Sequence, residues 1–187
     1  MKVLKILLFV FIGLILLFFL AGLLRPTVSY GHQITVNKDI KEAWAVYQDV
    51  SKYNQWLEGF KSIKLMEGEK NAVGSKYKVV VNPGDGQPDF EMIETVESFK
   101  EFDHMTLHFD SDVMIFDQIT TFVESNGKTK IKTDSKVRGK GIFLRSVFSL
   151  MELFTGSFQK QETKNIENLK KVIESNKTNY YSTSLEG

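Results

Sequence analysis

The chain has 187 residues, no cysteine, and 24 basic against 23 acidic side chains. Its length suits one folded domain with an appendage. Because three of the basic residues lie before position 26, the remainder is slightly acidic, which argues against a nucleic-acid-binding surface. The absence of cysteine excludes disulfides, thiolate metal sites and cysteine nucleophiles.

The N-terminus carries a long apolar segment. Residues 6–24, ILLFVFIGLILLFFLAGLL, contain no charge. As a helix this run would rise about 28 Å, close to the thickness of a bilayer's hydrocarbon core. It is longer than the apolar stretch of about 7–15 residues in a signal peptide, and no small-x-small cleavage site follows it. We therefore predict that residues 1–25 form an uncleaved transmembrane signal anchor, with a cleaved signal peptide as the alternative.

The charges around this segment predict its orientation. Lys2 and Lys5 precede the apolar run and Arg25 follows it. Since the more positive flank of a span stays in the cytoplasm, the N-terminus is predicted to be cytoplasmic and the domain to lie on the outer, extracytoplasmic side. Residues 26–29 then form a linker, and the polar residues 176–187 are predicted to fray.

The region between them is predicted to be α+β. Residues 31–37 alternate as a strand, and Asn37 or Asp39 can cap the helix that follows, with Glu42 placed to reach back. A shorter helix is predicted over 51–56. Six strand-like runs come next, separated by turn signals: 60–67, 75–82, 89–99, 104–110, 112–124 and 128–139. Helical spacing from about 142 to 175 predicts one long final helix, with Gly156 as its weak point. Consecutive strands flanked by helices indicate an antiparallel meander.

Two turns predict the register of the later strands. Asn126-Gly127 is a strong signal for a two-residue type I′ hairpin. Counting back from it gives the pairs Phe122–Ile131, Thr120–Thr133, Gln118–Ser135 and Phe116–Val137. A turn at Ser111-Asp112 would pair Phe109 with Met114 and Leu107 with Phe116.

The predicted inner face of the sheet is mixed in polarity. Its members are Met105, Leu107, Phe109, Phe116, Phe122, Ile131 and Val137, with Gln118, Thr120, Thr133 and Ser135 among them. Buried polar groups without partners cost about 1–3 kcal/mol each. They either pair with one another or with buried water, or they line a cavity. The last helix covers this face. Its first half contains more apolar residues than one buried face of a helix requires, so the additional ones are expected to face the ligand space or the membrane surface. Simple core packing is the alternative.

The chain resembles a known superfamily. The residues that carry the resemblance are VNKDIKEAWAVYQDVSKYNQW (36–56), GSKY (74–77) and NIENLKKVIE (165–174). Over residues 30–175 the sequence is similar to the START-like superfamily, in its polyketide cyclase/dehydrase and lipid-transport branch, often called SRPBCC. A proline often stands two residues after the family's Trp, whereas this chain has Glu58 there.

The resemblance implies a fold and a kind of site. The fold is the helix-grip fold, a seven-stranded curved antiparallel sheet wrapped around a long C-terminal helix, with two short helices after the first strand. Between sheet and helix, relatives hold lipids, sterols, polyketides or hormones in an apolar cavity. The family has no universal catalytic residue to carry over.

Candidate ligand contacts follow from the inner face and the resemblance. Aromatic residues after the first helix would wall one end of the cavity, although Trp56 alternatively plugs the helix–sheet junction. The candidates are Tyr53, Trp56, Phe60, Tyr77, Leu107, Phe109, Phe116, Gln118, Thr120, Phe122, Thr133, Ser135, Met151 and Phe158.

No metal or cofactor site is predicted. His104 and His108 imitate a helical zinc spacing, but four residues of strand span about 13 Å. Asp110 and Asp112 are simple turn formers. The glycine-containing stretches lack the strand and helix context of nucleotide-binding loops.

Two carboxylates are possible general acids or bases. Glu94 points inward if its strand pairs with the next strand through a four-residue turn, and burial would then raise its pKa. A one-residue slip exposes it, and this solvent-facing arrangement is the favoured interpretation. Glu162 lies on the predicted inner face of the last helix.

Three functions are compatible with these observations. The leading hypothesis is a non-catalytic, membrane-anchored module that binds or transports a hydrophobic small molecule or lipid, with residues 6–24 in the membrane. The first alternative is a cyclase/dehydratase-like enzyme that uses Glu94 or Glu162. The second alternative is an envelope scaffold with a filled core.

Overall fold

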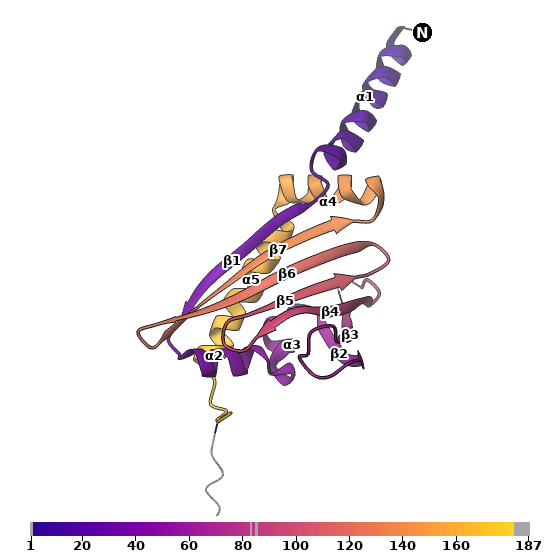
Figure 1. Cartoon of the computed structure of the whole chain (residues 1–187). Helices are drawn as coiled ribbons and strands as arrows, with labels where there is room; N and C mark the ends of the chain where they lie inside the picture. The colour runs from indigo at the N-terminus through magenta and orange to yellow at the C-terminus, as the bar shows by residue number, and fades with distance from the viewer. Residues whose placement is uncertain (1, 83, 85, 182–187) are drawn as a thin grey trace, which may run out of the picture.

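The computed structural model describes residues 2–82, 84 and 86–181. The elements are α1 (Lys2–Leu24), β1 (Val28–Val36), α2 (Ile40–Tyr47), η1 (Val50–Lys52), α3 (Tyr53–Trp56), β2 (Phe60–Glu67), β3 (Lys76–Val81), β4 (Phe90–Lys100), β5 (His104–Asp110), β6 (Met114–Ser125), β7 (Lys128–Gly139), α4 (Gly141–Thr155) and α5 (Ser157–Glu174). Helix α1 projects from one end of the domain, beside α4, whereas α2 and α3 cover the opposite end (Figure 1). The α+β prediction is confirmed.

The seven strands form one antiparallel sheet. Its order is β1-β7-β6-β5-β4-β3-β2, so the first strand pairs with the last and the others follow as a meander. Helix α5 crosses the inner face of this sheet (Figure 1). Strand β1 begins at Val28, which pairs with Val137, so the connection from α1 comprises residues 25–27 and is one residue shorter than the predicted linker 26–29.

The register predicted from Asn126-Gly127 is confirmed. Both residues have positive φ, +53° and +69°, as a type I′ turn requires. The four predicted pairs between β6 and β7 are all present.

The predicted pairs between β5 and β6 are wrong. Phe109 pairs with Phe116 and Leu107 with Gln118, so each partner in β6 lies two residues beyond the predicted one. The connection comprises residues 111–113 and is one residue longer than a Ser111-Asp112 turn. Ser111 closes this longer loop by donating its backbone N–H to Met114 O at 3.1 Å. A shift of two residues leaves the side-chain alternation unchanged, so the predicted inner face survives.

The predicted long C-terminal helix is present as α5, but its predicted extent from about residue 142 is wrong, because the helix is broken at Gly156. This residue adopts a left-handed conformation (φ +61°, ψ 35°) and ends α4 by donating to Glu152 O at 2.9 Å. The Glu152 carboxylate then accepts from the N–H of Phe158 at 2.9 Å, near the start of α5. The chain therefore changes direction, and only α5 runs along the sheet (Figure 1).

The predicted cap of the first domain helix is confirmed at Asp39. Its carboxylate accepts from the N–H of Glu42 at 2.9 Å. The Glu42 side chain does not complete the capping box but accepts from Lys38 Nζ at 2.8 Å and from Asn176 Nδ2 at 3.0 Å. The second predicted helix, 51–56, is a 3-10 turn (η1) followed by the short α3.

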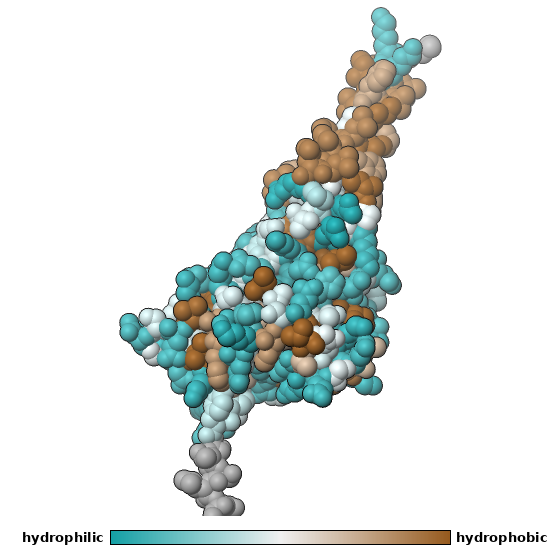
Figure 2. All heavy atoms as spheres, viewed as in Figure 1, coloured by the Kyte–Doolittle hydropathy of each residue, from teal (hydrophilic) through white to brown (hydrophobic). Residues whose placement is uncertain are grey.

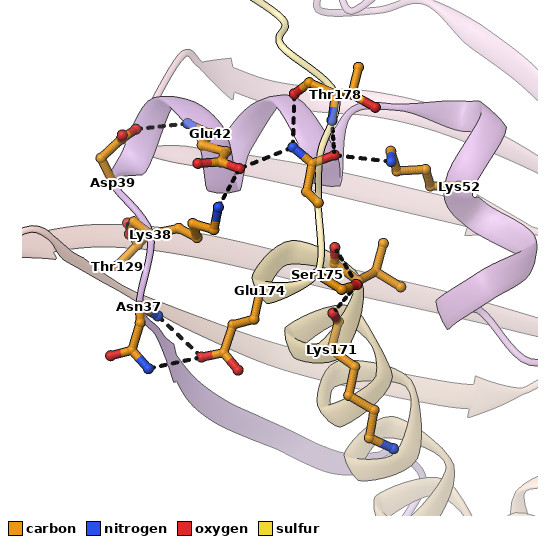
Figure 3. Close-up of polar contacts among 12 residues, drawn as sticks. Asn37, Lys38, Asp39, Glu42, Lys52, Thr129, Lys171, Glu174, Ser175 and Thr178 are labelled. Carbon is orange, nitrogen blue, oxygen red and sulfur yellow. Dashed lines mark hydrogen bonds and ion pairs between the residues drawn. The ribbon is translucent and has the colours of Figure 1, made fainter.

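The start of the polar tail is packed against this end of the domain. Asn176 is buried and its side-chain oxygen accepts from Lys52 Nζ at 3.1 Å. Its amide nitrogen donates to the Glu42 carboxylate and to the backbone oxygen of Thr178 (Figure 3). Tyr180 donates its hydroxyl to Asp49 at 2.7 Å. The prediction that the tail frays is therefore wrong for residues 176–181. The remaining tail residues, 182–187, lie outside the described part of the chain.

Helix α1 is long and apolar enough to cross a membrane. Its hydrophobic surface stands clear of the domain, whose visible face is mostly polar (Figure 2). Its last turns pack on α4, where Phe18 and Phe143 place their ring centroids 5.5 Å apart. Gly22 permits this approach, since a Cβ there would lie 2.6 Å from the backbone nitrogen of Ser146.

Candidate functional site

A cavity of about 190 Å³ lies between the inner face of the sheet, α3 and α5. The side chains from α2, α3 and the loop after it are Tyr47, Tyr53, Trp56, Leu57 and Glu58. The sheet contributes Phe60, Ile63, Val79, Val81, Met92, Glu94, Met105, Leu107, Phe109, Phe116, Gln118 and Thr120. Helix α5 contributes Glu162, Asn165 and Ile166. The lining is therefore apolar and aromatic with a small number of polar groups, as is typical of small-molecule sites.

Most of the candidate ligand contacts fall on this lining. Those that line the cavity are Tyr53, Trp56, Phe60, Leu107, Phe109, Phe116, Gln118 and Thr120, together with the carboxylates of Glu94 and Glu162. The candidates that do not line it are Tyr77, Phe122, Thr133, Ser135, Met151 and Phe158.

Three excluded candidates have packing or hydrogen-bonding roles. Phe122 packs edge-on against Trp44, with ring centroids 4.9 Å apart. The Tyr77 hydroxyl accepts from the N–H of Asn71 at 2.9 Å. Phe158 stacks on Tyr30 at 5.6 Å. These side chains are on or beside the predicted face, but they fill the space around the cavity.

The break at Gly156 explains why Met151 is also outside. Met151 belongs to α4, which turns away from the sheet, so it was assigned to the cavity only under the single-helix prediction. Thr133 and Ser135 lie toward β1, where Thr133 Oγ1 accepts from the N–H of His32 at 3.2 Å.

Several lining residues were missed by sequence reasoning. Val79 and Met92 face each other across β3 and β4, and Met92 shares the side-chain alternation of Glu94. The alternation is visible in the sequence, but the predicted ligand contacts do not include these residues. Tyr47 and Ile166 were read only as apolar helix faces, and Asn165 carries no signal in the sequence that marks it as a cavity residue.

One end of the cavity is aromatic. The rings of Tyr47 and Tyr53 lie 5.8 Å and 5.5 Å from that of Trp56, and Phe60 lies 5.4 Å from Tyr53. Trp56 Nε1 is buried and has no hydrogen-bond partner among the described residues. Trp56 therefore both closes the helix–sheet junction and lines the cavity, so the two predicted roles are compatible.

Glu94 is buried, contrary to the favoured solvent-facing interpretation. Its side chain is only 7% exposed, because β4 pairs it with two inward-facing neighbours, Tyr77 and Phe109. Loss of hydration raises the pKa of the Glu94 carboxyl to about 7. Within the described part of the chain its carboxylate makes no side-chain hydrogen bond or ion pair.

Glu162 is buried on the opposite wall and is hydrogen-bonded. Its carboxylate oxygens accept from Gln118 Nε2 at 3.3 and 3.4 Å, and the same amide donates to Ser135 Oγ at 3.1 Å. Burial raises the pKa of Glu162, with smaller opposing effects from the Thr133 hydroxyl and the charge of His32. Thr120 is satisfied by the Tyr47 hydroxyl at 3.1 Å. The four polar inner-face residues, Gln118, Thr120, Thr133 and Ser135, thus all have hydrogen-bond partners, and only Gln118 and Thr120 also adjoin the cavity.

Glu58 lies at the exposed mouth of the cavity and ties α3 to α5. Its N–H donates to Asn165 Oδ1 at 3.1 Å, and its carboxylate accepts from Gln161 at 2.7 Å and from Lys164 at 2.5 Å. The hydrogen bond from Lys164 is the main reason that the pKa of Glu58 lies below its usual value. This contact occupies the position where the family pattern often has proline.

The outer face of the sheet brings together Glu97, His108 and Asp117, whose ligand atoms lie within 4.8 Å of one another. His108 Nδ1 lies 2.6 Å from Asp117 and 4.0 Å from Glu97, so an ion pair accounts for the grouping. His104 contacts Ser98 at 2.9 Å instead, so the two histidines do not share a partner.

The domain is a helix-grip domain, in which the sheet, the short helices and α5 surround an apolar cavity. Solved structures of low identity share the fold: the protein Ara h 8.0201 (14% identity, 80% of this chain and 99% of that chain, TM-score 0.56), norcoclaurine synthase from Thalictrum flavum with dopamine and hydroxybenzaldehyde (16%, 82% and 90%, 0.56), and the di-domain ARO/CYC protein BexL from the BE-7585A biosynthetic pathway (14%, 81% and 51%, 0.58).

The sequence itself matches no protein-family model and no curated protein. At these identities the structural likeness establishes the fold. The chain therefore has the helix-grip fold of Bet v1-like and SRPBCC-type structures, as the sequence resemblance implied, and carries one N-terminal apolar helix in addition.

Proposed function

We propose that this protein is a membrane-anchored module that binds a small hydrophobic molecule in the cavity between the sheet and α5. The observation that carries the proposal is the cavity itself, about 190 Å³ of space lined mainly by apolar and aromatic side chains. An engineered apolar cavity of about 150 Å³ is large enough to bind benzene. The alternative of a scaffold with a filled core is disfavoured by the same space.

The cavity volume limits the occupant. Sites for drug-sized ligands measure about 300–1,000 Å³. A space of about 190 Å³ suits one ring or a short chain, and a two-chain lipid would need α5 to move outward. A structural neighbour, norcoclaurine synthase, is solved with dopamine and hydroxybenzaldehyde, which are single-ring molecules, and this supports the same size class here.

We place the protein at a membrane through α1 and α4. Helix α1 supplies the span, and α4 packs against its base at Gly22. Phe143, Leu153 and Phe154 of α4 are exposed, and apolar side chains at the base of a span are stabilised by contact with the lipid interface. Lys2 and Lys5 favour a cytoplasmic N-terminus and an extracytoplasmic domain. An inactive alkaline phosphatase fused to the C-terminus would overturn this orientation.

Ligand binding is tested by filling the cavity. The full-length chain in phosphatidylcholine nanodiscs is titrated with toluene, and the indole N–H signal of Trp56 is followed by NMR. We expect a saturable shift that Leu107→Trp abolishes and that Val123→Trp, an exposed position on β6, retains. Both variants must keep the circular dichroism of the parent, and the smaller Leu107→Phe replaces Leu107→Trp if they do not. An unshifted signal in the parent chain contradicts the proposal.

A second candidate function is a cyclase/dehydratase-like enzyme. It is favoured by Glu94, a buried carboxyl beside the cavity with a pKa of about 7, since an acid or base titrating near neutrality is suited to proton transfer. Under this alternative Glu94→Gln keeps substrate affinity and abolishes turnover. The enzyme alternative is excluded if the parent protein binds the ligand without turnover and Glu94→Gln lowers the affinity for that ligand.

A further inference from the structure

Resting on the proposed binding function, we propose that the occupant of the cavity carries a basic nitrogen, held as a cation between the Glu94 carboxylate and the aromatic rings of α2 and α3. This defines the ligand as a small apolar amine, and it excludes fatty acids and other anionic amphiphiles from the site.

The charge of the lining is one-sided. Glu58, Glu94 and Glu162 line the cavity, whereas the lining formed by the described residues contains no lysine, arginine or histidine. Binding an anion here would bring like charges together in a poorly hydrated space, where Coulomb energies are several-fold larger than in water. A cation is the complementary guest.

Among these three carboxylates, Glu94 is the one without a partner in the described structure. Lys164 and Gln161 satisfy Glu58, and Gln118 satisfies Glu162. A buried carboxylate that lacks both a hydrogen bond and a counter-charge is destabilised, and it keeps its proton toward neutral pH. A guest ammonium supplies both, so its binding energy comes from satisfying a group that the fold leaves unsatisfied.

The aromatic end supplies the other half of the site. Tyr47, Tyr53 and Trp56 are mutually packed and all three line the cavity. Burial is the main cause that raises the pKa of both tyrosines, and the charge of Glu94 contributes, which places the carboxylate within electrostatic reach of both phenols. Ring faces attract ammonium groups, and the attraction is stronger where water is excluded.

The apolar remainder of the lining sets the body of the ligand. Val79, Met92, Leu107 and Ile166 surround the space on the side of the sheet and α5. These side chains contact a ring or short chain but offer nothing to a second charge. The inferred ligand therefore has one charged end and one hydrocarbon end.

A matched set of probes tests the inference. Cyclohexylamine, cyclohexanol and cyclohexanecarboxylate share one ring and differ in charge. They are titrated into the full-length chain in phosphatidylcholine nanodiscs while the Trp56 indole signal is followed, with Trp44→Phe used to assign it. At pH 8 we expect the amine to bind at least tenfold more tightly than the alcohol, and the carboxylate to bind more weakly than both.

The dependence on pH is a second readout. The amine stays protonated between pH 6 and 8, while Glu94 loses most of its charge toward pH 6. The preference for the amine should therefore shrink several-fold on going from pH 8 to pH 6. The other titratable groups facing Glu94 are Tyr47, Tyr53, Tyr77 and Glu162. Burial raises the pKa of Tyr47 and of Tyr53, so these two phenols stay neutral over this range. The Glu162→Gln variant checks the contribution of Glu162.

The variant Glu94→Gln isolates the carboxylate. It should lower amine affinity at least tenfold and leave cyclohexanol binding unchanged, whereas Glu97→Gln, at an exposed position on the same strand, should change neither. Equal or tighter binding of the alcohol or the carboxylate overturns the amine inference and leaves the binding function standing. If none of the three probes binds, the proposed function itself fails.

Discussion

The two helices that end the domain, α4 and α5, use their residues in opposite ways. Helix α4 is the more apolar, yet it exposes Phe143, Leu153 and Phe154 and buries two serines, Ser146 and Ser149. Helix α5 is rich in charged residues, yet it buries one continuous face against the sheet. That buried face comprises Glu162, Ile166, Leu169, Val172 and Ile173.

The difference shows that neighbours, more than apolar content, decide where a helix lies. Helix α5 covers the inner face of the sheet and so needs one apolar stripe. Helix α4 lies beyond the sheet beside α1, where Ser146 permits the close approach of Gly22. Phe143 and Phe154 of α4 are then exposed next to a membrane-length helix.

The largest difference between the two helices is expected when one leucine in each is replaced by alanine and the free energy of unfolding is measured. Leu169 in α5 is 0% exposed and Leu153 in α4 is 61% exposed. Leu169→Ala should lower the free energy of unfolding by about 2–5 kcal/mol, because it removes buried contacts and leaves a void. Leu153→Ala should change it by less than about 0.5 kcal/mol. Chemical denaturation of the full-length protein in detergent micelles measures both, and similar losses would contradict the contrast.

The second prediction concerns the buried carboxyl of Glu94 and the pH dependence of stability. The pKa of Glu94 is about 7 in the folded chain against a usual value of 4.5. Below pH 4.5 both states are protonated, so stability is fully present there. As the pH rises, the unfolded chain ionises first, so stability falls and the loss reaches about 3 kcal/mol above pH 7. Glu94→Gln should therefore raise stability at pH 8 and change it little at pH 4.

The control for this prediction lies on the same strand. Glu97 is exposed, so Glu97→Gln should leave the pH dependence of unfolding as it is in the parent protein. Urea titrations at pH 4, 6 and 8 compare the three chains. A parent protein whose stability does not decline between pH 5 and 8 would show that Glu94 is hydrated or paired in solution.

A smaller effect is expected where the two helices meet. Gly156 has φ +61°, a conformation that costs residues with a Cβ about 1 kcal/mol. Gly156→Ala should therefore lower the free energy of unfolding by about 1 kcal/mol. Gly13→Ala, in the middle of α1 with open space around it, serves as the control and should not destabilise the domain. If Gly156→Ala raises stability instead, α4 and α5 form one continuous helix in solution.

Much of the fold was predictable because its signals are local. Asn126-Gly127 fixes the β6–β7 register, since few dipeptides accept positive φ at both positions. The Ser111-Asp112 region has no such requirement, and the strand pairing there is shifted by two residues from the predicted one. Gly156 was visible as a weak point, but whether glycine interrupts a helix depends on the packing on either side of it.

The site was less predictable, because it depends on where α5 crosses the sheet. The inner-face alternation selected Phe116 and Gln118, which line the cavity, but it also selected Thr133 and Ser135, which lie beyond it. Glu94 faces inward through its pairing with Tyr77 and Phe109. This register is a tertiary property, and a shift of one residue would have reversed it.

The last prediction concerns the exposed side of α4, where the effect on folding is smallest. Phe154 is 78% exposed, so Phe154→Trp should leave the free energy of unfolding within about 0.5 kcal/mol of the parent value. If α4 rests on the bilayer, the new indole enters the lipid interface, where a large apolar side chain gains about 1.5–3 kcal/mol on full burial. Its fluorescence should then be quenched by lipids with brominated acyl chains. Val123→Trp, exposed on the outer face of β6, should not be quenched, because that strand lies away from α1. If Phe154→Trp is not quenched, α4 remains in water and only α1 holds the protein at the membrane. Equal quenching at the two positions would contradict a contact that is specific to α4.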